Sequence, residues 1–189
     1  MIQTKQPRNK EKILEATISV LNGTGYLCLT IEGIAAEAGV GKATIYRWWP
    51  TKAHLVLDAF LMVTESAFPF DLNDSIKNNF VEQLKNLADV FSTTLGRSML
   101  AIIVEDKGIS DAFYTSYLSL RRKDSAAFLR QAMEREGIEA EVNIDILLDM
   151  LFGPIYFRIL IYKQTPDERF ISELVDHVIA GILPACSGK

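Results

Sequence analysis

The 189-residue chain has few of the side chains that enzymes and metal sites require. Its two cysteines, Cys28 and Cys186, and its two histidines, His54 and His177, match no metal-ligand, redox or triad spacing. Glycine-rich phosphate loops are absent, and the scattered carboxylates have no acid–base context. The sequence therefore predicts a protein that is not an enzyme and that uses no metal and no cofactor.

Signals for secretion, membrane insertion and β-structure are also missing. No apolar core follows the polar start of the chain, so no signal peptide is expected. The most apolar window, residues 144–162, contains Asp145, Asp149 and Arg158, each costing roughly 2.5–3.5 kcal/mol near a bilayer centre. We expect no membrane contact and a cytoplasmic location. No segment alternates strictly between apolar and polar residues, which predicts an all-α fold.

The most informative stretch that is present is the reader segment, residues 30–52, TIEGIAAEAGVGKATIYRWWPTK. Thr30 is a good N-cap, and Gly39 lies where a chain leaving a helix needs a positive φ. A second helix can then cover residues 41–49, and Pro50 ends it. Two short helices joined by a glycine turn are the layout of a helix-turn-helix DNA reader.

The second helix of the reader segment has an apolar side and a hydrogen-bonding side. A rotation of 100° per residue puts Ile45 and Trp49 on the apolar side. The other side offers an arginine and a threonine for base edges and a small alanine that permits close approach, while tyrosine and lysine suit phosphates. The alternative to a DNA reader is an ordinary helical hairpin whose polar face is only exposed to solvent. The predicted DNA-binding residues are Thr30, Lys42, Ala43, Thr44, Tyr46, Arg47, Trp48 and Lys52.

Residues 29–56, LTIEGIAAEAGVGKATIYRWWPTKAHLV, closely resemble the TetR (tetracycline-repressor-like) family of bacterial transcriptional regulators. Residues 147–183 resemble the last two helices of a common C-terminal domain in that family. The resemblance implies an all-helical dimer whose small N-terminal domain holds an operator and whose larger domain binds an effector. Gly33 and Trp48 depart from the family pattern, since many members carry an acidic residue and His or Arg there. The operator preference of relatives therefore cannot be transferred.

Two domains are expected: a helix-turn-helix DNA-binding domain, residues 1–54, and a helical effector-binding and dimerisation domain, residues 55–189. The first holds seven Lys or Arg against four Asp or Glu, and the second holds thirteen against twenty. Basic charge thus accompanies the reader segment within an acidic chain. Beyond the reader segment, helices are expected over residues 8–22 (ended by Gly23 and Gly25), 51–67, 75–95, 97–104, 111–136, 141–163 and 166–183, with loops at 105–108 and 164–166.

The last two expected helices carry more apolar surface than one small domain can cover. Packing them against their copies in a second chain would build a four-helix interface, which is the dimer that the resemblance implies. Burial within a single chain is the alternative. The predicted interface residues are Ile155, Ile159, Phe170, Leu174, His177 and Val178.

The middle helices are rich in aromatic and methionine side chains, which can line an apolar cavity, while tyrosine hydroxyls provide polar anchors. The TetR family places effectors among its middle helices, so the resemblance implies a small, mostly apolar effector there. Burial in an ordinary core is the alternative for each residue. The basic run 121–123 is interpreted as a solvated helix face, and the alternative is that it balances an anionic ligand. The predicted ligand-binding residues are Phe91, Met99, Tyr117, Phe152 and Tyr156.

These features predict a DNA-binding transcriptional regulator, an effector-responsive repressor that binds a palindromic operator as a homodimer. The helix over residues 51–67 would act as a lever between the effector and the reader segment. The competing class is a helical scaffold or enzyme with a helix-turn-helix-like hairpin that does not bind DNA specifically. Such a protein would show only weak, nonspecific retention on genomic DNA fragments.

Overall fold

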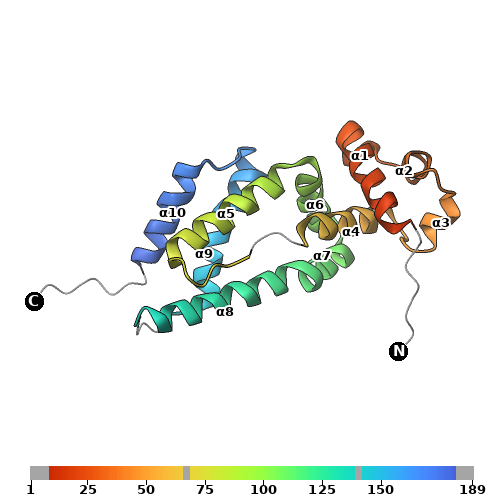
Figure 1. Cartoon of the computed structure of the whole chain (residues 1–189). Coiled ribbons are helices and arrows are strands. Elements are labelled where there is room, and N and C mark those ends of the chain that lie inside the picture. The colour runs from red at the N-terminus through yellow and green to blue at the C-terminus, as the bar shows by residue number, and fades with distance from the viewer. Residues whose placement is uncertain (1–8, 66–68, 139–141, 182–189) are drawn as a thin grey trace, which may run out of the picture. The chain divides into compact units, whose positions relative to one another are not determined.

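The computed structural model describes residues 9–65, 69–138 and 142–181, and every regular element in these ranges is a helix (Figure 1). The predicted all-α fold is confirmed. The chain divides into two compact units, unit 1 from residues 1–65 and 93–113 and unit 2 from residues 66–92 and 114–189. The expected boundary after residue 54 separates a DNA-binding domain from an effector-binding domain, which is a functional division and differs from these compact units. It stays a prediction.

Unit 1 carries the reader segment on a small helical core. α1 packs against α2, α4 and α6, and α4 also packs against α6 and α7. Fully buried side chains from separate helices meet there, and each contributes about 1.5–3 kcal/mol through burial. These include Ile13, Ile34, Leu55 and Phe60. The helices are α1 (Lys10–Cys28), α2 (Ile31–Ala38), α3 (Lys42–Tyr46), α4 (Lys52–Thr64), α6 (Thr94–Glu105) and α7 (Lys107–Phe113).

Unit 2 is a bundle in which α5 packs against α9 and α10, and α9 packs against α8 and α10. The segments Tyr114–Leu118 and Arg158–Tyr162 are π-helical, a geometry that often occurs at functional sites. The first of these turns, η1, continues α7 directly into α8, as the expected helix over residues 111–136 requires. The helices are α5 (Ile76–Ser92), η1 (Tyr114–Leu118), α8 (Ser119–Arg135), α9 (Ile144–Phe157), η2 (Arg158–Tyr162) and α10 (Glu168–Ala180).

Several helix boundaries differ from the expected ones because local caps decide them. Gly23 lies inside α1, and only Gly25, with φ 73° and ψ 167°, leaves the helical conformation. The hydroxyl of Thr93 accepts a hydrogen bond from the Gly96 amide at 3.0 Å, so α6 starts where one helix to residue 95 was expected. A loop was expected over residues 105–108, but only Asp106 separates α6 from α7. Its carboxylate accepts a hydrogen bond from the Ile109 amide at 3.1 Å.

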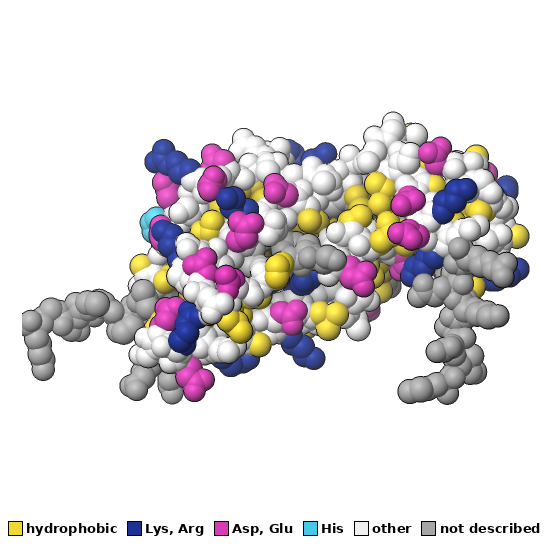
Figure 2. Space-filling model, viewed as in Figure 1, with side chains coloured by type: hydrophobic (Ala, Val, Ile, Leu, Met, Phe, Trp, Pro, Cys, Tyr) yellow, Lys and Arg dark blue, Asp and Glu magenta, His cyan; other side chains and the backbone are white. Residues whose placement is uncertain are grey.

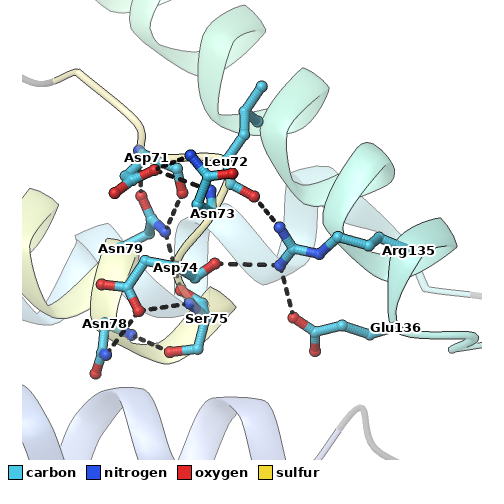
Figure 3. Close-up of polar contacts among 9 residues, drawn as sticks. All are labelled: Asp71, Leu72, Asn73, Asp74, Ser75, Asn78, Asn79, Arg135 and Glu136. Atoms are coloured by element: carbon cyan, nitrogen blue, oxygen red, sulfur yellow. Dashed lines mark hydrogen bonds and ion pairs between the residues drawn. The ribbon is translucent and has the colours of Figure 1, made fainter.

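A polar network joins the start of α5 to the end of α8 (Figure 3). The buried Asn79 amide accepts from the Asp71 amide at 2.8 Å and donates to the carbonyls of Asp71 and Ser75 at 2.9 and 3.0 Å. Arg135 of α8 donates to the carbonyl of Leu72 in the loop before α5. The buried Asn79 amide thus holds the loop on the start of α5, since leaving it without partners would be costly. Arg135, which also donates to the Asp74 carbonyl at 3.1 Å, ties the end of α8 to the same loop.

Among the described residues, one pair of helices has the combined length and composition of a membrane span. No single helix among the described residues is long and apolar enough to cross a bilayer, and only α5 and α6 taken together meet the length and composition of a span. Figure 2 shows acidic and basic side chains interspersed over the visible face, with apolar side chains between them.

Candidate functional site

The reader segment forms the expected pair of helices. The Thr30 hydroxyl accepts from the Gly33 amide at 3.1 Å and caps α2. Gly39, with φ 64°, ends α2 in the left-handed region, and the Val40 amide donates to the Ala35 carbonyl at 3.0 Å. This is a Schellman turn, which satisfies the last carbonyls of the helix. The predicted N-cap and glycine turn are confirmed.

The inner side of α3 is anchored to the core of unit 1. Ile45 is fully buried and Trp49 is 3% exposed, which confirms the predicted apolar side. The Trp49 indole donates to the Asp58 carboxylate of α4 at 3.0 Å, and Asp58 also pairs with Lys10 of α1 at 3.4 Å. α3 itself ends at Tyr46, earlier than the expected Trp49. Buried Ile45 therefore anchors α3, and Asp58 of α4 holds the residue Trp49 that follows it.

The outer side of α3 presents Lys42, Ala43, Tyr46 and Arg47 to solvent, whereas Thr44 and Trp48 are half-buried. Among the described residues, none forms an ion pair or hydrogen bond with the Arg47 guanidinium. Lys42 donates to Glu32 at 3.0 Å, and both side chains are more than half exposed. Such a pair contributes at most about 1 kcal/mol, so the Lys42 ammonium can be released cheaply to another anion.

Lys52 has a different position from the one expected for a phosphate contact. Its ammonium donates to the carbonyls of Tyr26 and Leu29 at 2.9 and 3.0 Å and, more weakly, to that of Leu27 at 3.4 Å. It also lies 4.6 Å from the centre of the Tyr26 ring. An ammonium has three donors, and all three are used here. In this structure Lys52 holds the end of α1, and the Thr30 hydroxyl caps α2 as predicted; contact of either residue with DNA stays a prediction.

Unit 2 contains a cavity of about 240 Å³ lined by α5, η1, α8, α9 and the residue Phe70. Tyr117, Phe152 and Tyr156, three of the five predicted ligand-binding residues, line it. The lining also contains the apolar residues Phe70, Leu87, Leu118 and Gly153 and the polar residues Gln83, Ser125, Asp124 and Asp149, none of which was predicted from the sequence. Arg121 and Arg122 of the basic run 121–123 lie in it as well.

The other two predicted ligand-binding residues lie elsewhere. Phe91 is fully buried behind the cavity, with its ring 6.4 Å from that of Tyr117 and 5.3 Å from that of Tyr156. Met99 is fully buried on α6 of unit 1 and is not part of the lining. The helix break at Thr93 separates α6 from α5, the helix that contributes to the cavity lining.

Charged and polar groups in the cavity wall are mostly paired or neutral. Arg122 bridges α8 to α9 through Asp149 at 2.6 Å and Asp145 at 3.1 Å, so this residue of the basic run is ion-paired rather than only solvated. Burial raises the pKa of Tyr117 to about 12 and also raises the pKa of Tyr156. Both phenols therefore stay protonated at neutral pH and can act as hydrogen-bond donors.

Three of the predicted interface residues are already covered inside the protomer. Ile155, Ile159 and Val178 are at most 6% exposed, so they are core side chains rather than contacts for a second chain. Phe170 and Leu174 are half-buried, with the Arg158 guanidinium 3.8 Å from the Phe170 ring centre, and His177 is exposed. A different set, the outer apolar face, lies on α9 and η2. It consists of Ile146, Met150, Phe157 and Ile161, each 50–62% exposed.

Family models match both parts of the chain. The model described as "Bacterial regulatory proteins, tetR family" matches residues 13–59. The model described as "Tetracyclin repressor-like, C-terminal domain" matches residues 73–178, more than half of the chain. The chain belongs to the TetR family. It is a DNA-binding transcriptional regulator, and its family consists of regulators rather than enzymes. The alternative, a scaffold or enzyme without specific DNA binding, is not favoured.

Relatives and solved structures agree over nearly the whole length. The chain is 31% identical to the HTH-type transcriptional regulator Rv1556 of Mycobacterium tuberculosis, covering 96% of this chain and 91% of that protein. It is 26% identical to the HTH-type transcriptional regulator YdeS of Bacillus subtilis, covering 96% of each. The crystal structure of the TetR family transcription regulator SCO0332 has 30% identity and a TM-score of 0.75, covering 94% of this chain and 100% of that one.

Proposed function

We propose that this TetR-family protein is an effector-responsive repressor that binds a palindromic operator as a homodimer in the cytoplasm. TetR-family regulators bind operators as dimers and respond to small molecules. A relative named as the DNA-binding transcriptional repressor TetR of Mycobacteroides abscessus, 25% identical over 172 residues, supports repression over activation. The observation that carries the proposal is the exposed outer side of α3, held from behind by buried Ile45 and Trp49.

In this proposal α3 enters the major groove of the operator. Arg47, exposed and without a protein partner among the described residues, contacts a guanine edge or a phosphate. Tyr46 and Lys42 contact phosphates, and Ala43 and Thr44 allow close approach to bases. Trp48, half-buried, packs against the sugar backbone. Thr30 and Lys52 contribute indirectly, because they hold the ends of the helices that orient α3.

The dimer in this proposal forms through the outer apolar face together with Phe170, Leu174 and His177 of α10. The side chains of this face, on α9 and its continuation η2, are half or more exposed, and the half-buried Phe170 and Leu174 lie on α10, which packs against α9; an exposed apolar patch of this kind is typical of an interface. A two-fold axis between α9 and α10 and their copies buries this surface and gives the dimer two reader segments. Two reader segments can then engage two half-sites at once.

Effector control in this proposal starts from the cavity of unit 2. α4 of unit 1 ends at Thr64, and Phe70 of the cavity lining follows it after a few residues in the chain. α7 of unit 1 ends at Phe113, and the next helical turn carries the lining residue Tyr117. A ligand that displaces Phe70 or Tyr117 therefore acts on segments that are covalently joined to the unit with the reader segment.

The experiment combines sedimentation, selection of genomic DNA fragments, and titration of the selected fragment with compounds that raise the melting temperature. We expect a dimer, specific fragments, and a change in DNA affinity of roughly 5- to 150-fold on binding such a compound, which corresponds to a coupling of ~1–3 kcal/mol. Ser125→Leu fills the cavity, so this variant should bind DNA normally and lose the response. Weak nonspecific retention, or a monomer, contradicts the proposal.

A further inference from the structure

We infer that the cavity of unit 2 takes an uncharged, flat compound of about two fused rings that carries a hydroxyl or carbonyl oxygen. This inference rests on the proposed function, because it names the chemical class of the effector. Four features of the cavity determine the class: its volume, its aromatic walls, the balance of its charges and one unpaired hydroxyl.

The volume sets the size of the ligand. The cavity measures about 240 Å³. An apolar protein cavity of roughly 150 Å³ binds one benzene ring, so a space about half as large again accommodates two fused rings. A single ring would leave part of the apolar lining without contacts, and a much larger fused system would not fit without displacing side chains.

Aromatic side chains surround both ends of the cavity. At one end Phe70 stacks on Phe128 with ring centres 4.4 Å apart, and Phe80 meets Phe152 edge-on at 6.4 Å. At the other end Phe91 meets the cavity residues Tyr117 and Tyr156 edge-on. Phe80 and Phe91 are both on α5, roughly 16 Å apart along a helix with a rise of 1.5 Å per residue. A flat aromatic ligand can make offset and edge contacts with the four rings that line the cavity, those of Phe70, Tyr117, Phe152 and Tyr156.

The charges of the cavity wall leave no strong site for an ion. Arg122 is paired with both Asp145 and Asp149, and Arg121 lies 5.6 Å from the Tyr117 ring centre. The lining therefore holds two arginines and two aspartates, and the remaining carboxylate, Asp124, is exposed to solvent. A charged ligand would lose its hydration without gaining a buried counter-charge, which favours an uncharged one.

The unpaired hydroxyl belongs to Ser125, which lines the cavity and is 3% exposed. Within the described ranges, no residue donates to or accepts from this hydroxyl. Every fully enclosed side-chain oxygen among those residues has a hydrogen-bond partner. The Ser125 oxygen has none, so it is not fully enclosed and reaches the cavity space. Gln83, 5% exposed, is fixed nearby in the lining by donating its amide to the Pro69 carbonyl at 3.1 Å. Because the Ser125 oxygen is accessible from the cavity, water or a ligand oxygen can bond to it, and a ligand with a hydroxyl or carbonyl can replace that water.

Four flat bicyclic probes of similar size that differ in charge and in their polar group test the inference by calorimetric titration of the full-length protein. They are 2-naphthol, naphthalene, 2-naphthoate and 1-methylquinolinium, which are respectively neutral with an oxygen, neutral without one, anionic and cationic at pH 7. We expect 2-naphthol to bind at least roughly tenfold more tightly than either ion. Ser125→Ala should weaken 2-naphthol binding roughly 2- to 10-fold and leave naphthalene unchanged, because one neutral hydrogen bond is lost.

Ser116→Ala, at an exposed serine on η1 outside the lining, is the matched control and should leave both affinities unchanged. The inference is overturned if either ion binds as tightly as 2-naphthol, if 2-naphthol does not bind, or if Ser125→Ala has no effect on its affinity. These titrations contain no DNA, so such a failure leaves the proposed repressor intact. Conversely, 2-naphthol that binds through Ser125 without changing operator affinity supports the cavity chemistry and contradicts its assignment to an effector.

Discussion

The reader segment of unit 1 and the cavity of unit 2 use their side chains in opposite ways. The outward groups of the reader segment lie on one short helix, are exposed, and depend on a few buried anchors such as Ile45 and Trp49. The cavity takes its lining from four separate stretches of chain, residues 70, 83–87, 117–125 and 149–156. One site is a local surface and the other is a product of tertiary packing, so mutations should affect them differently.

The largest effect should come from disrupting the proposed dimer without touching the reader segment. Met150→Glu combined with Phe157→Glu puts two carboxylates on the outer apolar face, where burial against a second chain would leave them unpaired. We expect a folded monomer by sedimentation, and operator affinity reduced more than roughly 100-fold because only one half-site is held at a time.

The control for this variant is Leu120→Glu, at another half-exposed apolar residue, on α8. It should remain dimeric and bind the operator like the unmodified protein. If Met150→Glu with Phe157→Glu also leaves a dimer, the outer apolar face is not the interface.

The comparison also explains what the sequence could predict. Thr30, Gly39, Ile45 and Trp49 were assigned correctly because caps, positive φ and helical periodicity depend on near neighbours in the chain. The role of Lys52 at the end of α1 was not predicted, because its partners are carbonyls more than twenty residues earlier, which no local pattern encodes.

Cavity residues were harder to predict for the same reason. An inward-facing aromatic side chain looks alike in a core and in a cavity wall, so Phe91 and Tyr117 could not be distinguished. The overlooked signal was polar: Gln83 and Ser125 occupy inward positions at helical spacing from buried Phe80 and Phe128. A polar residue on the buried side of a helix indicates either an internal partner or a cavity.

A smaller effect should distinguish Lys42 from Lys52, which the sequence predicted to be equivalent phosphate contacts. Lys52→Met removes hydrogen bonds to the end of α1 and should lower the free energy of unfolding by about 2 kcal/mol. Lys42→Met breaks only an exposed ion pair, so it should change stability by less than ~0.5 kcal/mol while flattening the salt dependence of DNA binding by about one unit. Urea unfolding and salt titrations measure both, and the reverse pattern would restore Lys52 as the phosphate contact.

The smallest expected effect concerns two glycines of unit 1. Gly39→Ala forces a side chain into the left-handed region at φ 64° and should lower the free energy of unfolding by ~1 kcal/mol. Gly23→Ala places a methyl group in open space inside α1 and should raise it by ~0.5–1 kcal/mol. Urea unfolding of both variants checks the pair, and equal destabilisation would mean that Gly39 does not form the turn described.

The central claim is that α3 reads an operator as part of a symmetric dimer, and sequencing the genomic fragments selected by the unmodified protein and by Arg47→Ala tests it most directly. The unmodified protein should enrich an inverted repeat with half-site centres a whole number of helical turns apart, about 10–10.5 base pairs each. Arg47→Ala should lower affinity by ~1–3 kcal/mol and lose base preference at the same position in both half-sites. Fragments without two-fold symmetry, or an unchanged preference after Arg47→Ala, would contradict the account.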